Sequence, residues 1–158
     1  TRVCESGLGF PGAMKTIIFD IDGTLSLVGD RVKCLSETPP NWDEFYERCG
    51  EDLPNWPVVK TWAALHATGT GPNIILLTGR RESVRKQTEE WLQKTGIHSY
   101  QHLLMRPDGD FRHDTIVKPA LLQRLDIRPD LVFEDRNTMV EYWRSVGVPC
   151  FQVAPGDF

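Results

Sequence analysis

Hydrophobic residues in this chain occur as short unbroken blocks that alternate with segments of helical periodicity. An unbroken apolar block is typical of a strand buried on both faces of a sheet. Strands are expected at Lys15–Asp20, Asn73–Leu77, Gln101–Met105, Leu131–Phe133 and Pro149–Val153. Helical spacing predicts helices at Trp42–Cys49, Val58–Ala67, Glu82–Thr95, Pro119–Leu125 and Asn137–Val146. The alternation predicts an α/β fold, a three-layer sandwich with a mostly parallel central sheet.

The length and the first residues suggest the extent of the domain. A chain of 158 residues fits one ordinary domain. Residues 1–13 lack the charged and apolar regions of a signal peptide, and Met14 stands directly before the first strand. We therefore expect a domain over 14–158, with 1–13 as a cloning remnant or the end of an upstream segment. Between the first two strands, residues 26–57 predict a small cap-like insertion.

Composition and charge exclude several classes of protein. No apolar run approaches the ~18 residues that span a bilayer, so no membrane segment is expected. A net charge of −4 excludes a globally basic nucleic-acid coat, although a local basic site stays open. The four cysteines lack the spacing of metal ligands, which favours a reducing, cytoplasmic setting. The glycines at 7, 9 and 12 precede a strand, whereas a dinucleotide-binding turn follows one.

Acidic, basic and hydroxyl side chains follow most of the predicted strands. In parallel sheets, ligands bind beyond the carboxyl ends of the strands, so these side chains are expected in one crevice. Gathered carboxylates favour Mg²⁺, and a carboxylate can attack phosphorus to form an aspartyl-phosphate. A second carboxylate can then serve as acid and base. The residues at these strand ends are Asp20, Asp22, Thr78, Gly79, Arg80, Glu134, Asp135 and Arg136, and Lys118 is expected to begin the helix after the polar loop at 107–113.

The motifs at these positions resemble the four signature motifs of the haloacid dehalogenase (HAD) superfamily of phosphotransferases. They are D-I-D-G-T-L from Asp20, then Thr78, Lys118 and E-D at 134–135, in this order. The chain is also similar to the 3′-phosphatase domain of bacteriophage polynucleotide kinase/phosphatase. That similarity includes T-G-R at 78–80, R-x-x-G-D-x-R-x-D-x-x-V-K at 106–118 and Q-V-A-P-G-D-F at the end. It implies a HAD-like, Rossmannoid fold with a minimal cap, and removal of a terminal 3′-phosphate from DNA or RNA.

The resemblance also implies a role for each catalytic residue. Asp20 would be the nucleophile and a Mg²⁺ ligand, and Asp22 the general acid and base, with its backbone carbonyl as a second metal contact. Asp135 would bind Mg²⁺, and Glu134 would support the metal through water at a position where the family tends to have Asp. Hydrogen bonds from Thr78 would hold the phosphoryl oxygens. Lys118 would pair with the phosphate and with Asp20.

The substrate is left open by the sequence. Besides Gly79 and Arg80 after the second strand, the residues that the resemblance assigns to substrate binding are Arg31, Arg106, Asp114 and Arg136. A small cap leaves the crevice open, which favours a polynucleotide 3′ end. The alternatives are a nucleotidase or broad small-molecule phosphatase, and an idle module that binds nucleic-acid ends. A kinase or ligase partner on another chain, and a phage or bacterial origin, belong to the same hypothesis.

Aromatic residues near the insertion are the remaining feature of interest. Most tryptophans lie at helical spacing or beside proline, which is typical of core packing. Trp42, Tyr46 and Trp56 are the exceptions, because their segment follows the catalytic loop. The four histidines have no partner at ligand spacing and are expected to be structural or exposed.

Overall fold

A central parallel sheet forms the middle layer of the protein. The structure, a computed structural model, describes residues 14–67 and 71–156. The sheet has five strands in the order β5-β4-β1-β6-β7, and all neighbouring strands are parallel. The strands are β1 (Thr16–Phe19), β4 (Asn73–Arg81), β5 (His102–Arg106), β6 (Leu131–Arg136) and β7 (Cys150–Gly156). The predicted fold class is confirmed.

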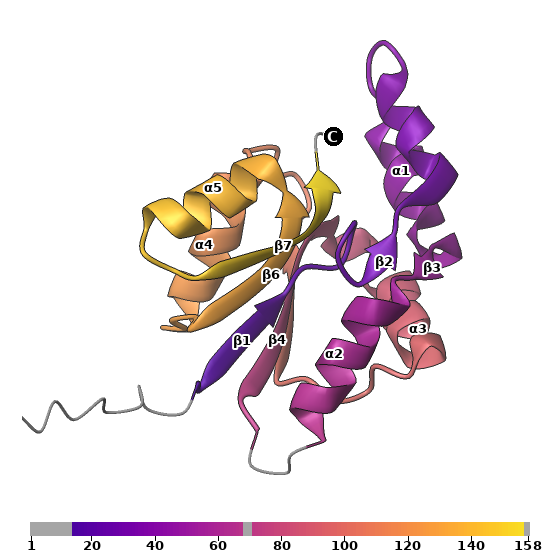
Figure 1. Cartoon of the computed structure of the whole chain (residues 1–158). Coiled ribbons are helices and arrows are strands. Elements are labelled where there is room, and N and C mark those ends of the chain that lie inside the picture. Colours follow the sequence, from indigo (N-terminus) through magenta and orange to yellow (C-terminus); the bar gives the residue numbers. More distant parts are fainter. Residues whose placement is uncertain (1–13, 68–70, 157–158) are drawn as a thin grey trace, which may run out of the picture.

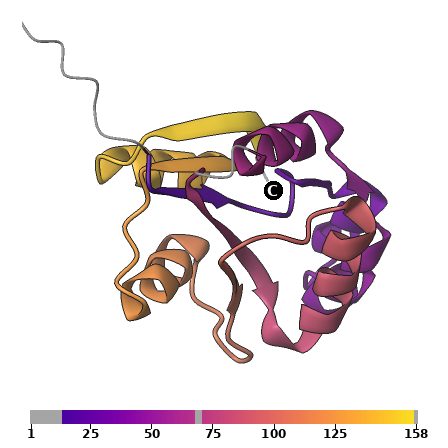
Figure 2. The same cartoon turned by 90° about the horizontal axis from the view of Figure 1, so that it is seen from below.

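Helices cover both faces of this sheet, as Figure 1 and the turned view in Figure 2 show. One core contains residues of α2 (Trp56–His66) and α3 (Arg85–Thr95), and the other contains residues of α4 (Asp114–Arg124) and α5 (Asn137–Ser145). Ile17 and Phe19 belong to the first core, whereas Ile18 between them belongs to the second. Successive side chains of a strand point to opposite faces, so a strand covered on both faces is apolar throughout.

The segment between β1 and α2 is more structured than the sequence predicts. It contains β2 (Ser26–Leu27), the 3₁₀ helix η1 (Gly29–Ser36), α1 (Trp42–Glu47), the 3₁₀ helix η2 (Arg48–Glu51) and β3 (Leu53–Pro54). Strands β2 and β3 pair antiparallel as a second, two-stranded sheet. Two-residue strands carry no periodicity, which explains why only α1 was predicted. Asn41 caps α1 as expected, since its side chain accepts a hydrogen bond from the Glu44 N–H.

The predicted start of α4 at Lys118–Pro119 is wrong. The helix begins at Asp114, and Pro119 lies inside it. Proline has no N–H, so one helical hydrogen bond is missing there. The start is set by His113, whose Nδ1 accepts a hydrogen bond from the Thr115 N–H. Asp114 and Lys118 are therefore four residues apart on one helix face, and both are buried.

Candidate active site

One lysine and three carboxylates meet at the carboxyl ends of β1 and β6. Asp20 follows β1, Glu134 and Asp135 lie on β6, and α4 brings Lys118 to them. The Lys118 Nζ donates to Asp20 Oδ1 at 2.7 Å and to Glu134 Oε2 at 2.8 Å. Each of the four residues is buried, and none is more than 4% exposed. The sequence prediction that these residues lie together is realised in the geometry.

The charges of this cluster do not balance. Burial raises the pKa of Asp20, and Glu134 raises it further, while Lys118 opposes both effects. Burial also raises the pKa of Asp135 to about 6, with a further contribution from Asp20. Three buried carboxylates share one lysine, so ionisation of all three leaves negative charge in a poorly solvated site. A bound cation would relieve this repulsion.

The donor set fits a divalent cation. One oxygen from each of Asp20, Glu134 and Asp135 lies within 4.8 Å of the others. Asp135 Oδ2 is buried and has no hydrogen-bond partner among the described residues. A buried carboxylate oxygen without a partner is costly, and hard oxygen ligands are those that Mg²⁺ prefers. Gly23 leaves room for this oxygen, because a Cβ there would lie 2.1 Å from Asp135 Oδ2.

Divalent cations are expected to stabilise the protein, and more strongly at pH 7.5 than at pH 5. Without metal, the raised pKa values of Asp20, Glu134 and Asp135 mean that the folded state retains protons that the unfolded state has lost. Stability in EDTA therefore falls as pH rises from about 4 through 6 and beyond. Magnesium at about 100 times its dissociation constant adds about 2.7 kcal/mol. Thermal unfolding would then shift upward by roughly 5–10 °C.

The matched variant for this measurement is Asp135→Asn. It removes a cation ligand and a buried negative charge together, so we expect a higher Tm than wild type in EDTA at pH 7.5. Magnesium should then add little. An equal magnesium shift in wild type and variant would contradict the assignment of Asp135 to the cation site. So would a wild-type Tm in EDTA that rises between pH 5 and pH 7.5.

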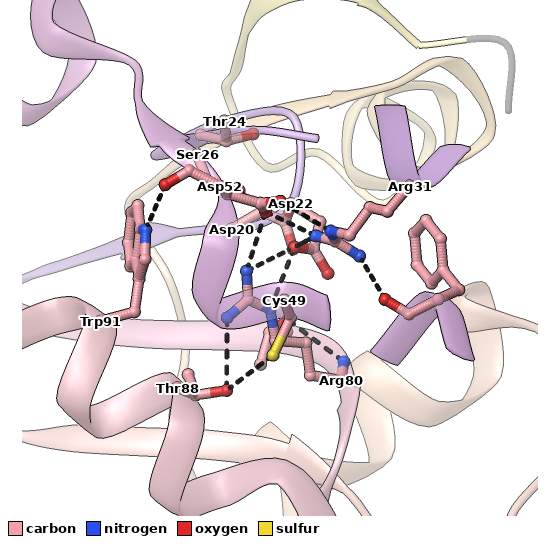
Figure 3. A network of polar contacts seen from close by, with 12 residues as sticks. Asp20, Asp22, Thr24, Ser26, Arg31, Cys49, Asp52, Arg80, Thr88 and Trp91 are labelled. Carbon is pink, nitrogen blue, oxygen red and sulfur yellow. Dashed lines mark hydrogen bonds and ion pairs between the residues drawn. The ribbon is translucent and has the colours of Figure 1, made fainter. Parts of the chain in front are cut away.

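Asp22 lies beside this cluster in a separate network of buried ion pairs, which Figure 3 shows. Arg80 donates to Asp22 Oδ1 from Nη2 at 2.7 Å and from Nε at 3.0 Å, and Arg31 Nη2 contacts the same oxygen. Both guanidinium groups are buried, and the Cζ of Arg31 lies 4.2 Å from the centre of the Phe45 ring. Although burial alone would raise it, the two arginines hold the pKa of Asp22 well below its ordinary value.

Asp52 completes this network and was not predicted from the sequence. Its two carboxylate oxygens accept from Arg31 Nε at 2.7 Å and Arg31 Nη2 at 2.6 Å, which is a bidentate pair. Arg80 Nη2 and the Ser26 hydroxyl donate to Asp52 as well, at 3.3 Å and 2.9 Å. The residue follows η2 in the insertion, where no motif marks it. Asp52 therefore orients both arginines that hold Asp22.

A third group of charges surrounds Asp114 at the start of α4. Arg106 Nη2 contacts Asp114 Oδ1, and Arg136 Nη1 donates to Oδ2 at 2.8 Å. Arg106 also donates to the Gly79 carbonyl at 3.1 Å and to two carbonyls of the loop at 107–113. The Arg106 guanidinium is thus directed at protein groups, and its contact with substrate stays a prediction. Gly79 leaves room for the Asp114 carboxylate, since a Cβ at Gly79 would lie 2.9 Å from Asp114 Oδ1.

Thr78 is the last residue of the unbroken buried run of β4. Its side chain is fully buried, and its Oγ1 accepts a hydrogen bond from the Arg80 N–H at 3.2 Å. Most of the predicted residues of this region line one narrow pocket together with two aromatic residues of α1, Phe45 and Tyr46. The predicted members are Asp20, Asp22, Gly79, Asp114, Lys118, Glu134, Asp135 and Arg136.

The geometry defines a site for chemistry on an anionic group. An unprotonated Asp20 oxygen is a nucleophile, and Asp22 beside it is a second carboxylate that can transfer protons. Lys118 and the arginines supply positive charge, and the three clustered carboxylates supply a cation site.

Among the described residues, no helix is long and apolar enough to cross a membrane.

Solved structures of low sequence identity share the fold of this chain. A HAD-superfamily hydrolase from Geobacter sulfurreducens matches 89% of this chain at 15% identity, with a TM-score of 0.52. A hydrolase from Streptococcus pneumoniae matches 90% at 14% identity, with a TM-score of 0.58. At such identity the likeness concerns the fold alone. It agrees with the α/β fold and the parallel five-stranded sheet described above.

The chain belongs to the family described as the polynucleotide kinase PNKP phosphatase domain, whose model matches residues 14–158. It is therefore a HAD-type phosphatase domain, and the predicted resemblance is confirmed. In the structure of the Pnkp1/Rnl/Hen1 RNA repair complex, one chain is 35% identical with a TM-score of 0.76. A protein of Autographa californica nuclear polyhedrosis virus, whose name describes a bifunctional polynucleotide kinase/RNA ligase, is 27% identical over 139 residues.

These relatives are longer than the chain. The match covers 98% of this chain but 48% of the chain in the RNA repair complex. It covers 85% of this chain and 18% of the viral protein. The activity, substrates and partners of the whole relatives are therefore not transferred with the family.

Proposed function

We propose that this protein is a Mg²⁺-dependent phosphomonoesterase that removes the 3′-phosphate from polynucleotide ends through an aspartyl-phosphate. The observation that carries the proposal is the cluster of Asp20, Glu134 and Asp135 around Lys118, with Asp135 Oδ2 unpartnered within the described chain. Such a cluster holds both a nucleophile and the ligands of a hard cation. The polynucleotide substrate is supported by family membership and by the names of the relatives.

The reaction would proceed in two steps, the formation and then the hydrolysis of the aspartyl-phosphate. An Asp20 carboxylate oxygen attacks phosphorus, the bond from phosphorus to the 3′ oxygen breaks, and that oxygen takes a proton from Asp22. A water then attacks the phosphorus of the aspartyl-phosphate and gives a proton to Asp22, which releases inorganic phosphate and regenerates Asp20. Asp20, Asp135 and, directly or through water, Glu134 would hold Mg²⁺, which would supply positive charge for the phosphate group. Lys118 keeps Asp20 oriented.

The network around Asp22 constrains its role in these steps. Both arginines hold Asp22 ionised, which is the form that accepts a proton from water. To donate a proton to the leaving oxygen, Asp22 must exchange part of its contact with Arg31 or Arg80 for contact with substrate. A phosphate dianion is a suitable competitor, because arginine binds phosphate oxygens in the same bidentate way. Binding of substrate would therefore prepare the acid form.

The proposal is tested by comparing substrates at equal concentration. We expect inorganic phosphate to be released from a 3′-phosphorylated oligonucleotide at least about 10-fold faster than from 3′- or 5′-mononucleotides or an aryl phosphate. EDTA should abolish release. Preference for mononucleotides would replace the proposal with a nucleotidase. No release from any substrate, with tight oligonucleotide binding, would indicate an idle end-binding module.

The names of the relatives also support a kinase or ligase that works with this phosphatase. Removal of a 3′-phosphate leaves a 3′-hydroxyl, which is the group that a ligase joins to a 5′-phosphate. We include such a kinase or ligase partner, on another chain, in the proposal.

A further inference from the structure

A second hollow opens directly beside the catalytic pocket and is lined mainly by aromatic and basic side chains. Its volume is about 380 Å³, and it shares Tyr46, Asp114 and Arg136 with the catalytic pocket. We call it the aromatic groove and define it by Trp42, Tyr46, Arg81, Phe111, Arg112 and Arg136. Because the two hollows share residues, a molecule whose phosphate reaches Asp20 extends naturally into this groove.

The wall of the groove is a row of rings and one guanidinium. Trp42 and Tyr46 of α1 are stacked, with ring centres 5.9 Å apart and planes inclined by 25°. The Arg81 Cζ lies 5.2 Å from the centre of the Tyr46 ring and 5.7 Å from that of Phe111. Arg81 is held there by Asp43, whose Oδ1 lies 2.5 Å from Nη1. Tyr46, in the middle of the row, lines the catalytic pocket, and the row extends from it to Trp42 on one side and through Arg81 to Phe111 on the other.

Phe111 is the unexplained member of this row. Its side chain is 81% exposed, although it is apolar and lies in the otherwise polar loop at 107–113. Trp42 at the other end of the row is 37% exposed. Exposed aromatic faces next to arginine are the surfaces on which unpaired nucleobases stack. Neither ring is needed to complete the core clusters of the fold.

The charges around the groove indicate how a ligand would bind. Four arginines line this hollow and share three carboxylate partners: Asp43 pairs with Arg81, Asp110 with Arg112, and Asp114 with both Arg106 and Arg136. Little net positive charge is therefore left at the rim, and the capture of many backbone phosphates is not its main source of affinity. The aromatic faces are the feature left to provide affinity, which selects a ligand with an unpaired base.

We propose that the aromatic groove binds the 3′-terminal nucleobase of a single-stranded polynucleotide, which stacks on Phe111 while the 3′-phosphate occupies the catalytic pocket. This inference rests on the proposed function for the position of the phosphate. It adds that the terminal base must be unpaired, because a base within a duplex cannot present its face to a side chain. It also assigns to Phe111 a role in the selection of substrate.

The test compares two 3′-phosphorylated oligonucleotides that differ in one group. One carries a normal terminal nucleoside, and the other carries an abasic sugar at that position. We expect wild type to show a KM about 10-fold lower for the base-bearing substrate, in line with the strength of base stacking on one ring. Phe111→Leu keeps an apolar side chain but removes the ring, and it should abolish this preference. Phe111→Trp should retain it.

A matched control is Trp56→Ala. Trp56 is 53% exposed and does not line the groove, so the preference for the base should survive its removal. Trp42→Ala, which shortens the row at its other end, should weaken the preference. Equal KM values of wild type for the base-bearing and abasic substrates would overturn the proposal. So would an equal loss on both substrates in Phe111→Leu.

Binding measurements separate this inference from the proposed function. Fluorescence anisotropy with the same two oligonucleotides reports on the groove without turnover. If wild type releases no phosphate from either oligonucleotide, the proposed function fails. Tighter binding of the base-bearing strand that depends on Phe111 would then still support the groove. No dependence on the base in either assay would overturn the inference itself.

Discussion

Replacing Asp20 with asparagine is expected to lower phosphate release at least about 10⁴-fold, the scale seen when a nucleophile is removed from a covalent mechanism. Asparagine has nearly the shape of aspartate, so the backbone turn after β1 should be retained. Its amide cannot form the aspartyl-phosphate. The measurement is kcat on a 3′-phosphorylated oligonucleotide with saturating Mg²⁺. Acid-quenched phosphoprotein should be detected with wild type and not with the variant.

The same substitution is expected to leave folding intact and to raise stability in the absence of metal. Burial and the Glu134 carboxylate raise the pKa of Asp20, so its ionised form is unfavourable in the folded state at neutral pH. Asparagine removes that charge, while Lys118 keeps Glu134 as a partner at 2.8 Å. We expect a Tm in EDTA at pH 7.5 that is higher by roughly 2–4 °C for each kcal/mol gained.

Asp30→Asn is the matched control for Asp20→Asn. Asp30 is exposed on η1, where it pairs with Lys33 at 2.7 Å, and it does not line the catalytic pocket. Such a surface pair contributes little, so neither kcat nor Tm should change appreciably. Activity of Asp20→Asn within about 10-fold of wild type would exclude Asp20 as the nucleophile.

Replacing Asp52 with asparagine is expected to cost stability and activity together. Without Asp52, the buried guanidinium groups of Arg31 and Arg80 share the single negative charge of Asp22, and the loss of one partner from a buried ion pair costs up to about 3–5 kcal/mol. For a domain of this size, this corresponds to a fall in Tm of roughly 6–20 °C. The reason lies in the contacts of Asp52 with two buried arginines, Arg31 and Arg80.

Activity should fall through kcat, because Asp52 acts on Asp22 through the arginines. With Arg31 and Arg80 no longer oriented, the proton-transfer group is misplaced, and a loss of about 10²-fold corresponds to the lower range for acid–base assistance. The assay is run below the Tm of the variant, so that unfolding does not contribute. KM for an oligonucleotide should rise as well, since Arg31 and Arg80 are also the groups proposed to contact the substrate phosphate.

A double-mutant cycle separates this positioning role from a merely structural one. If Asp52 acts through Asp22, the double variant Asp22→Asn/Asp52→Asn should be no slower than Asp22→Asn alone. Full additivity of the two losses in kcat would show that Asp52 serves the fold and not the proton transfer. An unchanged Tm in Asp52→Asn would contradict the buried ion pair itself.

Local patterns in the sequence were sufficient for the sheet and for the residues at its edge. The unbroken apolar blocks at 15–20 and 73–77 identify strands, because a strand covered on both faces is apolar at every position. Strand ends of a parallel sheet share one edge, so Asp20 and Asp135 could be placed in one site without coordinates. Lys118, which lies on a helix, was assigned to the same site by the family motif. The start of α4 was misplaced because Pro119 is a common first-turn residue and here lies inside the helix.

The sequence by itself therefore determined the α/β fold, the family and the carboxylate and lysine cluster, since each follows from short-range pattern or motif. Only the tertiary structure decided what the arginines contact. Arg31 and Arg80 are 21 and 28 residues from Asp52 in the sequence and contact it in the structure. Phe111, in the loop at 107–113, contacts Arg81 at the end of β4. Such pairings depend on how the insertion and the loop at 107–113 fold back over the sheet. Sequence periodicity does not predict these pairings, because they depend on contacts between residues far apart in the chain.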